Sequence, residues 1–109
     1  MYKTQTEQKY SRMEKTQAKK LHSCATVMKA IAHPMRLQII ELLYRENRKS
    51  VKDIYEELQI NQAVASHHLG ILKDKNILDC EREGKNIYYF LREKSINEVI
   101  QNLADLTVV

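Results

Sequence analysis

The sequence predicts a mainly α-helical (α+β) fold with about five helices and one two-stranded β-hairpin, in a chain of 109 residues. Apolar residues recur at helical spacing along most of the chain from residue 21 onward. The exception is residues 77–91, where apolar and polar residues alternate and β-branched and aromatic residues are frequent, which is typical of strands. Two glycines and one proline leave few interruptions between the helices.

The first two helices are expected to meet at a proline. A helix over residues 21–32 is predicted by one apolar stripe: Leu21, Cys24, Ala25, Met28, Ile31 and Ala32. Pro34 ends this helix and suits the first turn of the next one, for which His33 is a candidate N-cap. The second helix, over residues 34–46, is apolar around most of its circumference, so we expect it at the centre of the core. Asn47 suits a left-handed stop.

Two short helices separated by about three residues are expected next. Ser50 and Asp53 have the spacing of a variant capping box and begin a third helix, which runs to about Leu58. Asn61 is a preferred N-cap for a fourth helix over residues 62–74. The inward line of this fourth helix consists of Ala65, Leu69 and Leu72.

The C-terminal part is expected to form a hairpin followed by one helix. Residues 77–83 and 87–91 are the predicted strands, and residues 84–86 form the turn between them. Ser95 and Glu98 have the spacing of a second capping box, which opens a closing helix. The apolar stripe of that helix consists of Ile96, Val99, Ile100, Leu103 and Leu106.

Two short helices and a hairpin in this order indicate a winged helix-turn-helix, whose second helix enters the major groove of double-stranded DNA. The candidate DNA-contacting residues are Gln62, Ala63, Ser66, His67 and Lys73 on that helix, with Arg82 and Lys85 on the hairpin. Glutamine can bond adenine through two hydrogen bonds, serine can bond bases or phosphates, and an alanine methyl can meet the methyl of thymine. Gly70 would let the helix backbone approach a phosphate. The alternative is that these are ordinary solvent-facing residues.

The charge of +4 is unevenly placed along the chain. Residues 1–50 contain 11 Lys and Arg against 4 Asp and Glu, whereas residues 51–109 contain 7 against 10. A basic half suits a polyanionic partner. We therefore predict two parts, a basic N-terminal arm or helix extension at residues 1–20 and a DNA-binding and dimerisation domain at residues 21–109.

No apolar run approaches the roughly 18 residues that a membrane span needs, and the basic N-terminus has no signal-like apolar stretch. We expect a cytoplasmic protein without membrane partners. Glycine-rich phosphate loops, nucleophile elbows and paired carboxylates in an apolar setting are absent from the sequence, so an enzyme is not expected.

Four segments stand in a characteristic order: AHPMRL at 32–37, SVKDI at 50–54, a helix at 61–69 ending in SHHL, and REGKNIYYFL at 82–91. Together they resemble the ArsR/SmtB family of bacterial repressors over roughly residues 21–107. The resemblance implies a homodimeric winged-helix repressor that sits on a near-palindromic operator and leaves when a small inducer binds. The identity of the inducer is not implied.

Dimerisation is also expected from the residues themselves. One central helix and a hairpin cannot cover both apolar stripes, at residues 21–32 and 96–106. Such stripes are commonly buried against a second copy with two-fold symmetry. Two-fold symmetry places the two recognition helices about one DNA turn apart, which predicts an inverted repeat.

The metal sites that the resemblance would imply are not visible in this sequence. Residues 51–55 contain no cysteine, and residues 94–109 contain no histidine. His22 and Cys24 are two apart on a helix and chelate poorly. His68 is expected to be structural or to touch a phosphate rather than to bind metal. We therefore expect no metal and no cofactor.

The two cysteines, Cys24 and Cys80, are candidate redox residues. Both occupy apolar positions and are expected to be small buried hydrophobes, which are usually inert. Three alternatives stay open: a thiol-responsive regulator, a metal-responsive regulator, and a winged helix that contacts proteins without specific DNA binding.

Overall fold

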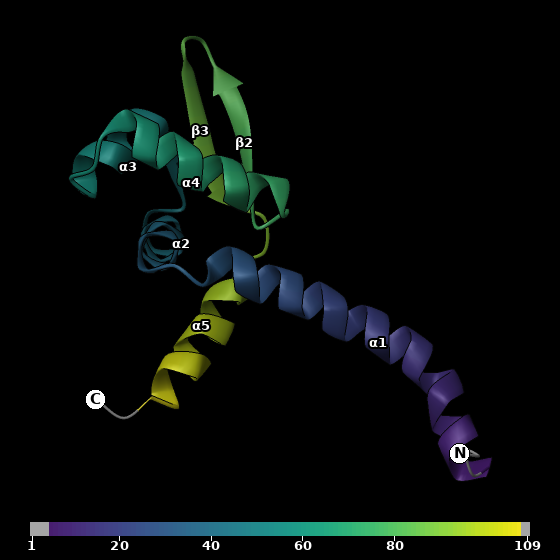
Figure 1. Ribbon diagram of the computed structural model, residues 1–109. Helices are drawn as coiled ribbons and strands as arrows, with labels where there is room; N and C mark the ends of the chain where they lie inside the picture. Colours follow the sequence, from purple (N-terminus) through teal and green to yellow (C-terminus); the bar gives the residue numbers. More distant parts are fainter. Residues whose placement is uncertain (1–4, 108–109) are drawn as a thin grey trace.

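The structure is a computed structural model that describes the backbone of residues 5–107 and the side chains of residues 15–107. In chain order its elements are α1 (Gln5–Ile31), α2 (Pro34–Glu46), β1 (Arg48–Ser50), α3 (Val51–Glu57), α4 (Gln62–Asp74), β2 (Leu78–Glu83), β3 (Asn86–Leu91) and α5 (Ser95–Asp105). In Figure 1, α4 lies across the base of the β2–β3 hairpin, while α1 and α5 extend away from the other side of α2. The predicted winged helix-turn-helix is confirmed.

The core forms around α2, as its apolar circumference predicts. Ile39, Ile40, Leu42 and Leu43 of this helix are almost completely buried. Buried residues from the surrounding elements pack with them: Ala30, Ile31, Ile54, Leu69, Leu72, Ile77, Leu78 and Leu91. This single core joins α3, α4 and the sheet, so packing sets where the predicted DNA-binding elements lie relative to one another.

The sheet has three strands, one more than the two-stranded hairpin that the sequence predicts. Strand β1 pairs antiparallel with β3, and the strand order is β1-β3-β2. Ser50 and Glu81 lie opposite Tyr88 from its two sides. Because β1 has only three residues, two of them basic, it carries no alternation that sequence reasoning could detect.

Three of the four predicted helix starts are capped as expected. The amide of Met35 donates to Nδ1 of His33 at 3.0 Å, the amide of Asp53 to Oγ of Ser50 at 3.1 Å, and the amide of Val64 to Oδ1 of Asn61 at 2.8 Å. These bonds satisfy amide groups that a helix leaves unpaired at its start. Asn47 ends α2 as expected and has a positive φ of 66°, but its ψ of −57° lies outside the left-handed helical region.

The capping box predicted for Ser95 is wrong. Ser95 is already helical, the N-cap is Lys94, and no side chain caps this end. Lys94 itself has a helical backbone conformation, and the amides of Ile96 and Asn97 donate to the carbonyls of Glu93 and Lys94. Helix α5 therefore begins with a backbone turn, and no side-chain hydroxyl accepts a hydrogen bond from its first amide groups.

Helix α1 begins well before the predicted start at residue 21. Residues 5–20 extend the helix, which was one of the two expectations for the N-terminal arm. The side chains of Lys3, Lys9 and Arg12 in that arm lie outside the described residues, and the division at residue 20 stays a prediction. Among the described residues, no helix is both long and apolar enough to span a bilayer.

Candidate nucleic-acid interface

Helix α4 presents one face to the core and the opposite face to solvent. Ala65, Leu69 and Leu72 are completely buried, as predicted. The candidate contact residues on this helix are exposed: Gln62, Ala63, Ser66, His67 and Lys73. At about 100° per residue, Ala63 and His67 point most directly away from the buried line, while Gln62, Ser66 and Lys73 follow the side nearer Leu69.

A hollow of about 330 Å³ separates α4 from the hairpin and α3. It brings together three predicted contact residues, Gln62 and Ser66 from α4 and Lys85 from the wing. Lys52 and Tyr55 of α3 and Asn86 of β3 also line it. The candidate site residues did not include Lys52, although a lysine in the first turn after the Ser50 cap was a visible signal.

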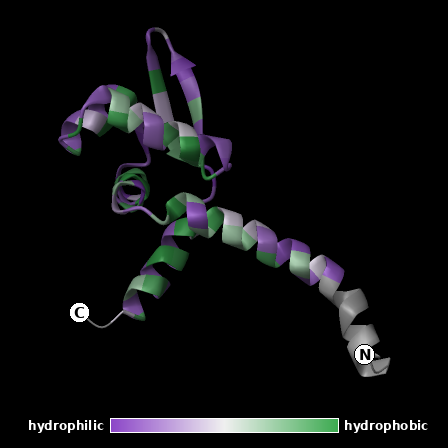
Figure 2. Ribbon diagram, in the orientation of Figure 1, coloured by the Kyte–Doolittle hydropathy of each residue, from purple (hydrophilic) through white to green (hydrophobic). Residues whose placement is uncertain are grey.

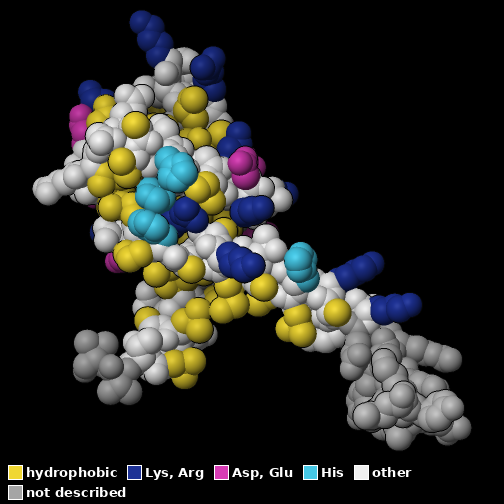
Figure 3. All heavy atoms as spheres, in the orientation of Figure 1, with side chains coloured by type: hydrophobic (Ala, Val, Ile, Leu, Met, Phe, Trp, Pro, Cys, Tyr) yellow, Lys and Arg dark blue, Asp and Glu magenta, His cyan; other side chains and the backbone are white. Residues whose placement is uncertain are grey.

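The wing carries its basic residues near the turn. Gly84 has a φ of +60° and allows the tight reversal, and Arg82 and Lys85 on either side are exposed. Arg82 lies opposite Ile87, which lines the hollow. Because directly opposed residues share a face of a sheet, Arg82 lies on the side of the wing that faces α4. Figure 3 shows Lys and Arg side chains projecting from the hairpin tip.

Two acidic residues of the wing, Glu81 and Glu83, form ion pairs with an arginine that sequence reasoning missed. Arg48 of β1 lies 2.7 Å from a carboxylate oxygen of Glu81 and 2.7 Å from one of Glu83, with its guanidinium 4.0 Å from the centre of the Tyr88 ring. These carboxylates belong to the opposite face of the hairpin from Arg82. The single charge of Arg48 offsets about half of this negative charge, which would repel a polyanion.

The far end of α4 meets the wing through Lys73. The neighbouring Cys80 side chain, more than any other group, raises the pKa of Lys73. Lys73 is therefore placed beside β2, away from the hollow that holds Gln62 and Ser66. Cys80 is half-buried rather than fully buried.

Cys24 contradicts its prediction more strongly, because it is exposed. Its Sγ lies 3.8 Å from Sδ of Met28 on the next turn of α1. The apolar stripe on which Cys24 lies is not covered by any other part of the described protomer at this point. The expectation of a buried, inert thiol is therefore wrong for Cys24 and only partly right for Cys80.

His68 is buried, with 7% of its surface exposed. This burial fits a structural role, which is one of the two roles that the sequence predicts for it. Its ring is 4.5 Å from the ring of His33 and 5.3 Å from that of His67, and its Nδ1 accepts from Nε of Arg36 at 3.2 Å. Burial lowers the pKa of His68, and the charges of His33, Arg36 and His67 lower it further. In the described part of the chain, no group of three or more His, Cys, Asp or Glu side chains is arranged to hold a metal ion.

Residues 33–79 match the family described as bacterial regulatory protein, arsR family. The transcriptional repressor PagR of Bacillus anthracis is 34% identical over 83 residues, which cover 76% of this chain and 83% of that protein. A cadmium resistance transcriptional regulatory protein CadC homolog of Staphylococcus aureus is 32% identical over 96 residues, which cover 87% and 79%.

Solved structures agree with these relatives. The crystal structure of PagR superimposes with a TM-score of 0.71 at 32% identity, over 79% of this chain and 98% of that one. The solution structure of the homodimeric winged helix-turn-helix DNA-binding domain of Mb0332 from Mycobacterium bovis gives 0.74 at 30% identity, over 84% and 87%. The chain therefore belongs to the arsR family of bacterial regulatory proteins, as a DNA-binding transcriptional regulator with a winged helix-turn-helix fold.

Proposed function

We propose that the protein is a homodimeric repressor that binds an inverted repeat in double-stranded DNA. The observation that carries this proposal is the exposed polar face of α4, which borders the hollow shared with Lys85 of the wing. Gln62 and Ser66 would contact base edges in the major groove, together with Ala63 and His67. Lys85, Arg82 and Lys73 would contact phosphates, which add affinity without reading sequence.

The second copy would cover the apolar surface of α1 and α5. Leu21 is 59% exposed and Leu106 is 79% exposed. A groove of about 320 Å³ between α1, α2 and α5 has almost entirely apolar walls that include Met28, Leu37 and Leu103. Exposed apolar surface of this extent on two adjoining helices favours a protein partner, and two-fold pairing would set two copies of α4 about 34–36 Å apart.

The protein would act in the cytoplasm and by occupancy of DNA rather than by catalysis. A repressor on its operator excludes polymerase from the same duplex. The regulatory signal would then be whatever changes the affinity of the dimer for that site.

Selection of bound duplexes from a random pool tests this proposal. We expect enrichment of an inverted repeat whose half-site centres lie about one helical turn apart. A release screen with zinc, copper, arsenite, peroxide and persulfide on the selected duplex would then identify the class of inducer. Weak binding that shows no sequence preference would instead support a winged helix used for protein contacts.

A thiol response is a second candidate for the signal, favoured by the exposed Cys24 on the proposed dimer surface and by Lys73 beside Cys80. Cys24→Ser and Cys80→Ser proteins would be bound to the selected duplex and treated with oxidant. Loss of release in either variant would identify the responsive thiol. Unchanged release in both variants would end this candidate.

A further inference from the structure

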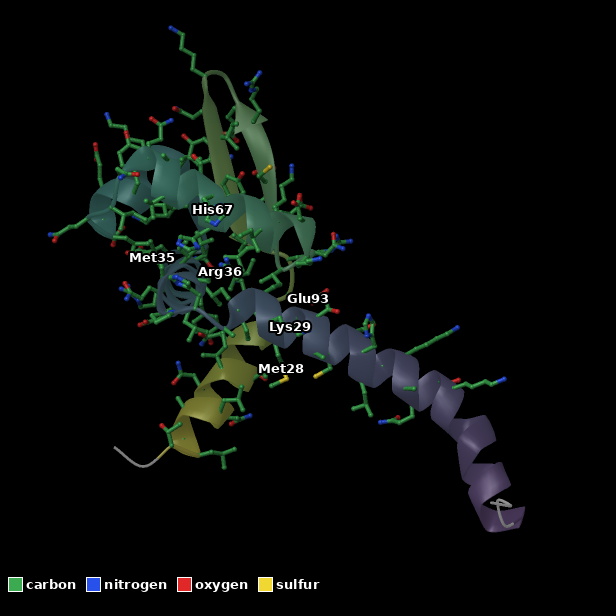
Figure 4. The ribbon with its side chains drawn as sticks, viewed as in Figure 1. Met28, Lys29, Met35, Arg36, His67 and Glu93 are labelled. Atoms are coloured by element: carbon green, nitrogen blue, oxygen red, sulfur yellow. The ribbon has the colours of Figure 1, made fainter. Side chains whose placement is uncertain are left out.

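One side chain connects the end of α1 to the recognition helix. Nη1 of Arg36 donates to the carbonyl of Ala30 at 2.9 Å, and Nε of the same residue donates to Nδ1 of His68 at 3.2 Å. Figure 4 shows Arg36 between α2 and α4, close to His67. Helix α1 belongs to the proposed dimer surface and α4 to the proposed DNA surface, so Arg36 bonds directly to both.

The bond to α4 requires one protonation state of His68. Nδ1 can accept a hydrogen bond only when it carries no hydrogen, and an arginine cannot act as the acceptor instead. The His68 ring is therefore neutral, with its hydrogen on Nε2. Since His68 is only 7% exposed, water is poorly placed to replace Arg36 as the partner of its ring.

The groups that face His68 oppose its protonation. Arg36 comes from α2, His33 from the residue that caps α2, and His67 from α4 itself, and all three lower the pKa of His68. Lys29 in the last turn of α1 is exposed and also basic. Glu93, the acid labelled in Figure 4, is exposed and borders a different hollow with Lys75 and Asn76.

A proton on His68 would therefore break a bond and add a charge at once. It would occupy Nδ1, where Arg36 now donates, and would place a second positive charge beside the guanidinium in a buried position. The simplest relief is movement of α4 away from α2, because Arg36 is also held by the Ala30 carbonyl. Such a movement would shift Gln62 and Ser66 relative to the wing.

We propose that Arg36 and His68 are positioning residues that hold α4 in its DNA-binding orientation only while the His68 ring is neutral. This inference rests on the proposed function, since it concerns how the same surface is held in place. It adds a dependence of DNA affinity on pH that comes from a buried side chain away from the DNA.

The first test compares wild type with His68→Asn by fluorescence anisotropy on the selected duplex, from pH 8.0 to pH 5.5 at constant ionic strength. Asparagine retains an acceptor near the position of Nδ1 but does not titrate. We expect wild type to lose more affinity than His68→Asn as the pH falls, by less than about tenfold at pH 5.5, because the lowered pKa of His68 limits protonation of its ring. His22→Asn, an exposed histidine of α1, should keep the wild-type profile.

The comparison isolates His68, because the two proteins differ only in this side chain. Parallel profiles for wild type and His68→Asn, with specific binding present in both, would overturn this inference and leave the proposed function intact. Absence of any specific binding by wild type would overturn the proposed function instead.

A second test needs no DNA. Nitrogen-15 NMR of labelled histidines should show the neutral His68 ring with its hydrogen on Nε2, and Arg36→Leu should raise its titration midpoint by removing a neighbouring cation. A hydrogen on Nδ1 in the wild-type ring, or a midpoint unchanged by Arg36→Leu, would overturn the link. Circular dichroism of each variant identifies a failure to fold, and His68→Asn then provides the remaining comparison.

Discussion

The region of α3, α4 and the hairpin differs from the region of α1 and α5 in the chemistry of its outer surface. The outward side of α4 is polar, and the hairpin tip is hydrophilic, whereas α5 and the end of α1 expose hydrophobic residues (Figure 2). Both regions pack against α2, so the difference does not come from the core. It indicates two partners of different chemistry: a polyanion on one side and a second protein surface on the other.

The two regions should therefore fail in different ways when they are altered. Changes near α4 should alter which sequence is bound and how affinity depends on salt. Changes on α1 and α5 should alter assembly and should affect DNA only through the loss of the second half-site.

The largest effect is expected from a charge on the apolar surface. Leu103→Lys places an ammonium group in the groove between α1, α2 and α5 and should prevent dimer formation. Affinity for the inverted repeat should then fall by about 100-fold or more, because the two half-sites are no longer bound by one linked unit. Sedimentation velocity and anisotropy measure the two effects, with Gln101→Lys on the exposed side of α5 as the matched control.

The next largest effect should come from the polar side of α4. Gln62→Ala and Ser66→Ala should each reduce discrimination between operator and altered base pairs by about 1–3 kcal/mol for a lost pair of base contacts. Dimer formation should stay unchanged. Measured affinities for single-base variants of the operator decide this, and equal affinities across wild type and both variants would show that α4 does not read bases here.

A smaller effect is expected at the wing. Lys85→Ala should weaken binding to every sequence alike, on the order of fivefold at 0.15 M salt, and lower the slope of log affinity against log salt by about one. A salt titration with specific and random duplexes measures both quantities. A changed sequence preference without a changed slope would place Lys85 at a base rather than at a phosphate.

The helix caps provide a comparison within the fold itself. Asn61→Ala should lower the free energy of unfolding by about 1 kcal/mol, because the amide of Val64 loses its acceptor. Ser95→Ala should have almost no effect, since α5 has no side-chain cap. Urea denaturation of the two variants measures this difference, and equal losses would contradict the assignment of the caps.

The smallest effect separates stability from binding at Gly70. An added Cβ there would meet no atom within 4 Å, so Gly70→Ala should raise the free energy of unfolding by about 0.5–1 kcal/mol through helix propensity. If the α4 backbone approaches a phosphate at this position, operator affinity should fall in the same variant. Unchanged affinity would show that the glycine is not needed for DNA.

Local signals in the sequence predicted the DNA-binding region well. The bounds of α2 and α4, three of the four caps and the burial of Ala65, Leu69 and Leu72 follow from periodicity and hydrogen-bonding chemistry within a few residues. The proposed contacts of individual side chains with DNA stay predictions.

What could not be predicted depends on contacts between distant residues. Strand β1 exists because Arg48 and Ser50 pair with Phe90 and Tyr88, some forty residues later in the chain. The link from Arg36 to His68 likewise joins residues of two helices. An apolar stripe does not reveal whether the surface that covers it belongs to the same chain or to another. For this reason the sequence wrongly predicts that Cys24 is buried within its own chain.

Binding of the protein to one complete operator and to the same duplex with one half-site scrambled tests the central claim most directly. Anisotropy titration at known protein concentration gives both stoichiometry and affinity. The two-sided account predicts two chains on the complete duplex and a loss of about 100-fold or more in affinity when one half-site is scrambled. One chain per duplex, with equal affinity for the complete and the scrambled site, would contradict it.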